Sequence, residues 1–105
     1  MSEVTAVPEA ISAFGDLEAI IAADLIAAGT VNVAAVSALL TPVFGVIGAE
    51  HLAATVAAMA TNAFETAQLA AVHAGHAAAA HSIARNFSTV DEDNSVQLSN
   101  IGTLI

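Results

Sequence analysis

The chain has 105 residues, enough for one small domain, and ten acidic residues against one basic residue give it a formal net charge of −9. A surface of this sign repels phosphate, so the composition excludes nucleic-acid binding and disfavours anionic membrane surfaces. The absence of cysteine excludes disulfides and thiolate metal sites.

Alanine is the commonest residue, and aromatic residues make up only 4% of the chain. Alanine favours helix but buries little apolar area, so alanine-rich helices must pack closely over a long seam. Such a chain is marginally stable alone. The composition therefore predicts a partner protein or copies of the same chain.

The first predicted helix begins at Pro8-Glu9, after a short mobile lead of residues 1–6. Proline suits the first helical position because its missing amide would be unpaired there, and glutamate complements the positive end of the helix dipole. Gly29-Thr30 is a candidate kink, but a continuous helix to about Leu39 is the preferred interpretation. Residues at three- and four-residue steps form one face of this helix: Ile11, Phe14, Leu17, Ile21, Leu25, Ala28, Asn32, Ala35 and Leu39.

The segment from Thr41 to Gly48 is predicted to be a turn. Pro42 has no amide to donate, and the glycines of this segment permit positive φ. A second helix is predicted from about Ala49 to Asn86 or a few residues beyond.

Two long helices joined by a short turn must lie antiparallel. The predicted fold class is therefore all-α, a helical hairpin over residues 1–90, which a partner would complete into a four-helix bundle. Residues 91–105 change to a polar composition and are expected to form a flexible C-terminal tail.

The stretch from Leu25 to Ala49 carries no formal charge and is nominally long enough to span a bilayer. It also contains several glycine, threonine, asparagine and serine residues, and no lysine or arginine flanks it. Glu3, Pro8 and Glu9 stand where a Sec-type signal peptide would need basic and then apolar residues. We therefore expect helix packing and no stable membrane span.

The histidines are candidate metal ligands. His73 and His76 are three residues apart on the second helix and could chelate a metal, but no carboxylate lies nearby in the sequence to complete a site. The serines lie in no nucleophile elbow, and Gly45-Val-Ile-Gly48 is too short and too apolar for a phosphate loop. We expect no catalytic residue, no metal site, no cofactor and no enzymatic activity.

Phe87 and Asp91 are four residues apart, so they share one face if the second helix extends that far. The acids Asp91-Glu-Asp93 oppose the dipole at a helix C-terminus, so the helix is expected to end before Asp91 or to fray there. An aromatic ring and a carboxylate beside a flexible tail form a candidate recognition epitope.

With these motifs the chain resembles the PE family of mycobacterial type VII (ESX) secretion substrates, which is named for a Pro-Glu pair near the N-terminus. Pro8-Glu9 matches that pair, and Phe87-x-x-x-Asp91 falls where the family carries a Tyr-x-x-x-Asp/Glu export signal. Phenylalanine replaces tyrosine, which weakens any recognition that hydrogen-bonds the hydroxyl. ESX secretion-associated proteins end similarly, with an aromatic residue, a spaced aspartate and further acids.

The resemblance implies a non-enzymatic protein that pairs with a PPE-like helical partner and is exported through the ESX machine, to be secreted or held at the cell surface. It assigns the secretion signal to Phe87 and Asp91. The expected partner interface or core is Ile11, Phe14, Ile21, Leu25, Val56 and Met59. Two alternatives stay open: a small membrane-active, holin-like protein, and a self-assembling helical oligomer.

Overall fold

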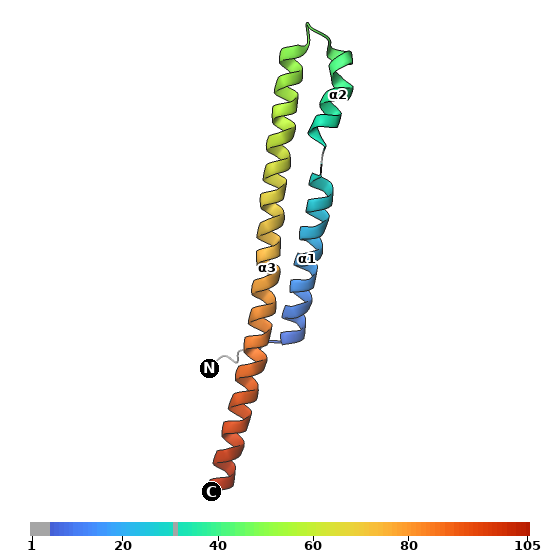
Figure 1. Ribbon diagram of the computed structural model, residues 1–105. Coiled ribbons are helices and arrows are strands. Elements are labelled where there is room, and N and C mark those ends of the chain that lie inside the picture. Colours follow the sequence, from blue (N-terminus) through green and yellow to red (C-terminus); the bar gives the residue numbers. More distant parts are fainter. Residues whose placement is uncertain (1–4, 31) are drawn as a thin grey trace. The chain divides into compact units, whose positions relative to one another are not determined.

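The computed structural model describes residues 5–30 and 32–105 (Figure 1). They form three helices, which are α1 (Pro8–Gly29), α2 (Val33–Phe44) and α3 (Ala49–Leu104). No strand occurs in the described ranges, so the all-α class is confirmed. Residues 1–4 of the expected N-terminal lead lie outside the described residues.

The expected continuous first helix is wrong, because the chain leaves helical geometry between α1 and α2. The hydroxyl of Thr30 donates to the carbonyl of Ile26 (2.7 Å) at the end of α1. Asn32 then caps α2, with its side-chain oxygen accepting a hydrogen bond from the amide of Ala35 (2.9 Å). Asparagine is a strong helix cap, so it starts a new helix here instead of continuing the old one.

The expected turn is shorter than the sequence indicates. Thr41 and Pro42 belong to α2, and the turn is confined to residues 45–48. Gly45 has a φ of 61°, and its amide donates to the carbonyl of Thr41 (3.0 Å), which closes the helix. A Cβ on Gly48 would lie 2.7 Å from the carbonyl oxygen of Phe44, so the turn also requires glycine there.

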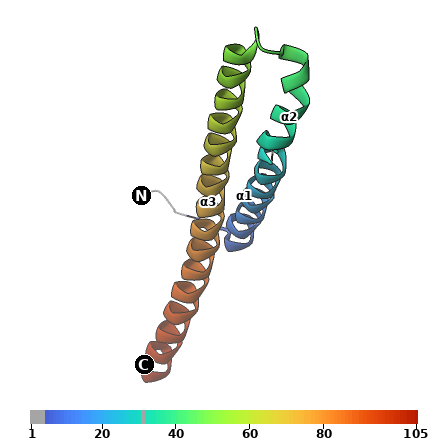
Figure 2. The same ribbon diagram turned by 45° about the horizontal axis from the view of Figure 1, so that its top comes forward.

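The second long helix begins at Ala49 as predicted, but its expected end is wrong. It continues without interruption to Leu104, through the segment that was expected to be a polar tail. Figure 2 shows this last part of α3 continuing beyond the point where α1 starts. The acids at positions 91–93 therefore lie inside the helix, where the dipole effect of a helix end does not reach.

The chain divides into two compact units, and the boundary between them falls inside both α1 and α3. The terminal unit contains the residues up to Ile20 and Ala74–Ile105, and the central unit contains Ile21–His73. Each unit is therefore described by itself.

In the terminal unit, the first half of α1 packs on α3 through very small residues. Gly15 is buried on α1, and a Cβ there would lie 2.9 Å from His81 Nε2 and 3.2 Å from the carbonyl oxygen of Ala77. The buried apolar residues of α3 in this unit are Ala77, Ala80 and Ala84. The two helices approach closely because almost no side chain stands between them.

The central unit is built in the same way. Ala22 and Ala70 are its buried apolar residues, and a Cβ on Gly29 would lie 2.8 Å from Thr66 Cγ2. Within this unit Ser37 of α2 shares a surface hollow with Val56 of α3. Among the described residues, all those that are both apolar and buried are alanines.

A matched pair of glycine substitutions tests the close packing of the terminal unit. Gly75→Ala adds a methyl group where nothing lies within 4 Å, so it should stabilise α3 by about 0.5–1 kcal/mol. Gly15→Ala adds the same group against α3 and should lower the melting temperature. Thermal unfolding followed by circular dichroism distinguishes them, and an equal increase for both would contradict this packing.

The cap of α2 gives a second prediction. Asn32→Ala removes the acceptor for the amide of Ala35 and should cost about 1 kcal/mol, whereas Asn32→Asp retains an acceptor and should cost little. Amide hydrogen exchange of residues 34–36 measures the effect locally. If Asn32→Ala leaves their exchange unchanged, the cap does not hold this helix.

Candidate functional site

The Pro-Glu pair starts α1, as its sequence predicts. The carbonyl of Val7 accepts hydrogen bonds from the amides of Ala10 (3.0 Å) and Ile11 (3.1 Å), so Pro8 occupies the first helical position. Glu9 follows in the first turn and is exposed. Its carboxylate therefore stands at the positive end of the helix dipole.

The start of α1 and the later part of α3 line one open groove of about 430 Å³ in the terminal unit. α1 contributes Pro8, Glu9 and Ser12. The lining residues from α3 are His81, Ala84, Arg85, Ser88 and Thr89. Ser88 and Thr89 belong to the segment between Phe87 and Asp91, although Phe87 and Asp91 themselves are not among the lining residues.

Phe87 and Asp91 both lie within α3, so their four-residue spacing places them on the same side of one helix. The Phe87 side chain is 40% exposed, and Asp91 is exposed. Phe87 also lines a small, mostly apolar hollow with Ile83, Asn86 and Val90. The predicted epitope is thus displayed on a helix and not beside a non-helical tail.

The six residues expected at the partner interface or core have mixed exposure. Ile11, Leu25, Val56 and Met59 are half-buried. Phe14 is 52% exposed and Ile21 is 40% exposed, so neither side chain is hidden within its own unit. A partner over this set stays a prediction.

One side of α3 becomes polar and exposed past the start of α1. Helical spacing continues the side that carries Ala77 and Ala84 into Ser88, Asp91 and Ser95, which are polar and exposed. An adjacent side keeps exposed apolar residues: Ile83, Phe87, Val90, Leu98 and Ile101. This apolar side (the α3 stripe) faces no residue that buries it among the described parts of the terminal unit.

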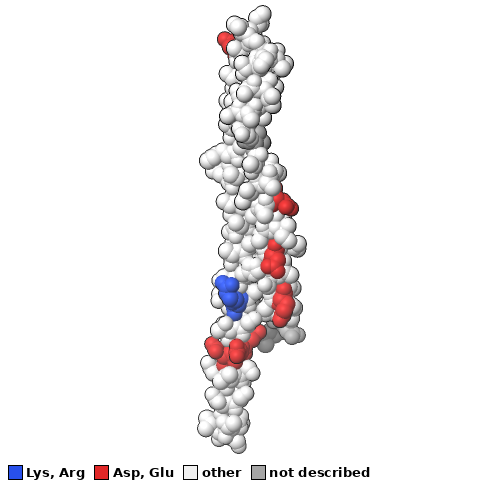
Figure 3. Space-filling view, turned by 45° about the vertical axis from the view of Figure 1, so that its right-hand side comes forward, with Lys and Arg blue, Asp and Glu red and all other residues white. Residues whose placement is uncertain are grey.

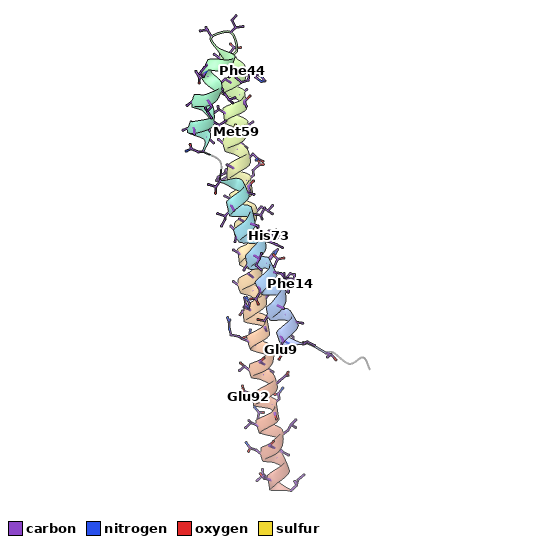
Figure 4. All side chains as sticks on the ribbon, turned by 90° about the vertical axis from the view of Figure 1, so that its right-hand side faces the viewer. Glu9, Phe14, Phe44, Met59, His73 and Glu92 are labelled. Atoms are coloured by element: carbon purple, nitrogen blue, oxygen red, sulfur yellow. The ribbon has the colours of Figure 1, made fainter. Side chains whose placement is uncertain are left out.

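The charges are unevenly spread. On the face in Figure 3 one basic group lies among acidic groups, and the last turns of α3 carry none. Figure 4 shows Glu9 at the start of α1 and Glu92 on the part of α3 that lies past this start. Acidic groups thus accompany both motifs in the terminal unit.

Two histidine–carboxylate pairs join α1 to α3 in the terminal unit. His81 Nε2 lies 3.2 Å from Asp16 Oδ1, and its Nδ1 lies 3.1 Å from the hydroxyl of Ser12. His76 Nδ1 lies 3.4 Å from Glu18 Oε2, and the Glu18 side chain is only 11% exposed. These carboxylates are not near the histidines in the sequence, because they come from the other helix, so spacing along one helix cannot reveal them.

By length and composition, the stretch Pro8–Phe44, which contains α1 and α2, is apolar enough to cross a membrane. Only 6% of its most apolar window is buried in the structure. Comparison with known protein families, curated proteins and solved structures finds no match.

Proposed function

We propose that this chain is a non-enzymatic helical protein whose exposed apolar surface is covered by a helical partner. The observation that carries this proposal is the contrast between what is buried and what is exposed. Alanines form the apolar core of the described residues, while large side chains such as Phe14, Leu17, Ile26 and Leu69 are about half exposed or more. Burying one such side chain fully stabilises a protein by about 1.5–3 kcal/mol, so covering several of them is a strong drive to associate.

The chain forms an antiparallel hairpin in this proposal. Contacts within the terminal unit support it, since Ser12 pairs with His81 and Glu18 pairs with His76. Residue numbers rise along α1 as they fall along α3. In the central unit Gly29 packs on Thr66, which follows the same order. A hairpin with one apolar side completes a four-helix bundle when a second hairpin packs on it.

The resemblance to the PE family gives this partner a more specific identity. We assign the chain to type VII secretion, paired with a PPE-like protein and exported to the medium or cell surface. Phe87 and Asp91 act as the recognition signal. Their exposure on α3 supports an accessible signal, and Ser88 and Thr89, which lie between them in the sequence, line a groove with Pro8 and Glu9.

A membrane-active protein is the second candidate. The apolar stretch Pro8–Phe44 and its low burial favour it. Helical partner association is preferred because Asp16, Glu18 and Asp24 confine the charge-free part of that stretch to the residues from Leu25 on. There the helix is interrupted between α1 and α2, and breaks in backbone hydrogen bonding are costly in lipid.

Analytical ultracentrifugation of the chain, alone and with its partner, tests the association. Alone and without detergent, the chain should be weakly cooperative in thermal unfolding or self-associated. With a helical partner it should form a stable heterodimer with a melting temperature at least about 10 °C higher, as expected for a gain of a few kcal/mol. A stable, cooperative monomer counts against partner covering, and quantitative co-flotation with lipid vesicles supports the membrane candidate instead.

Substitution of Phe87 tests the recognition signal in a host that has a type VII system. Phe87→Ala should lower the exported fraction about tenfold or more, because aromatic anchors dominate recognition sites, and Phe87→Tyr should keep or raise export. Phe64→Ala is the control, since Phe64 is an exposed phenylalanine of α3 outside the motif. Unchanged export of Phe87→Ala would remove Phe87 from the signal.

A further inference from the structure

The contact between Glu18 and His76 has the geometry of a metal-binding pair. A tetrahedral Zn²⁺ ion with bonds of about 2.0–2.1 Å holds neighbouring ligand atoms about 3.3 Å apart. In the terminal unit His76 Nδ1 and Glu18 Oε2 are separated by 3.4 Å. Two such atoms can bind one ion with little movement of either helix.

The surroundings of the pair also suit a cation. The carboxylate of Glu18 is nearly buried between helices, where water screens its attraction to a cation less than at the surface. The His76 side chain is 58% exposed, so an ion and a water ligand can reach the pair from solvent. The net charge of −9 attracts cations to the chain as a whole.

A further imidazole lies one helical turn away on the same element. His73 precedes His76 by three residues in α3, a spacing that places two side chains next to each other on a helix surface. Glu18, His73 and His76 each offer one ligand atom. Two imidazole nitrogens and one carboxylate oxygen, with water in the fourth position, form a recurrent Zn²⁺ ligand set, whereas Mg²⁺ and Ca²⁺ prefer oxygen ligands.

We propose that Glu18 and His76, with His73 one turn earlier in α3, bind one Zn²⁺ ion per chain. The ion bridges α1 and α3, so it stabilises the folded chain. This site depends neither on a partner protein nor on secretion, so its test is independent of the proposed function.

The test uses the whole chain, purified without a histidine tag and titrated with Zn²⁺. Isothermal titration calorimetry should give one ion per chain. Proton NMR should show the imidazole signals of His73 and His76 shifting together, with those of His51 and His81 unchanged. Both ring nitrogens of His81 already contact other side chains, and the ring centroids of His51 and Phe44 lie 5.2 Å apart in the central unit. Mg²⁺ in the same buffer should produce no shift.

Variants then assign the ligands. His76→Ala, His73→Ala and Glu18→Gln should each weaken Zn²⁺ binding about tenfold or more. His51→Ala should leave the affinity within about twofold. Because Glu18→Gln replaces a nearly buried group, the circular dichroism of this variant is compared with that of the native chain to check that it folds. The NMR titration of the native chain does not depend on this variant.

Three results would overturn the proposal. They are no heat and no imidazole shift at millimolar Zn²⁺, equal shifts of all the histidines, and one ion for every two chains with a doubled sedimentation mass. A Zn²⁺-dependent rise in melting temperature that His76→Ala abolishes and His51→Ala retains would support it.

Discussion

The absence of a side chain at Gly15 is the constraint on which the terminal unit depends. Not even a methyl group fits there without displacing His81 or crowding the backbone of Ala77. Helices that approach this closely are held by many small contacts instead of a few large ones. The same closeness brings polar groups of α1 within reach of α3, so that Asp16 meets His81 and Glu18 meets His76.

A seam of glycine and alanine leaves the larger apolar side chains on the outside. Buried alanines contribute little apolar area, so each unit has a weak core and an apolar surface. The α3 stripe follows from this arrangement. The side that faces α1 turns polar at Ser88, where α1 starts, while the stripe continues to Ile101. One side of α3 therefore becomes polar past the start of α1, whereas the α3 stripe stays apolar. In our proposal, the partner covers the α3 stripe.

Local rules predicted the features that one short segment determines. Pro8 starts α1, α3 starts at Ala49, and Gly45 adopts the positive φ that glycine permits, because each depends on the backbone preferences of a few residues. Spacing alone puts Asn32 on the apolar face of a continuous helix, but an asparagine side chain favours a helix N-cap over a buried position. The end of α3 differs from the prediction because the acids at 91–93, which are unfavourable at a helix C-terminus, lie inside a longer helix. The histidine–carboxylate pairs could not be found along one helix, since they require the register between two.

Amide hydrogen exchange of the isolated chain at low concentration tests the central claim most directly. If the small-residue seam is the core of the terminal unit, amides of residues 77–84 should exchange slowly, and those of residues 92–104 should exchange nearly as fast as in a free helix. Slow exchange that extends evenly to Leu104 in a monomer would contradict the account, because the last turns of α3 would then be stable with their apolar stripe uncovered.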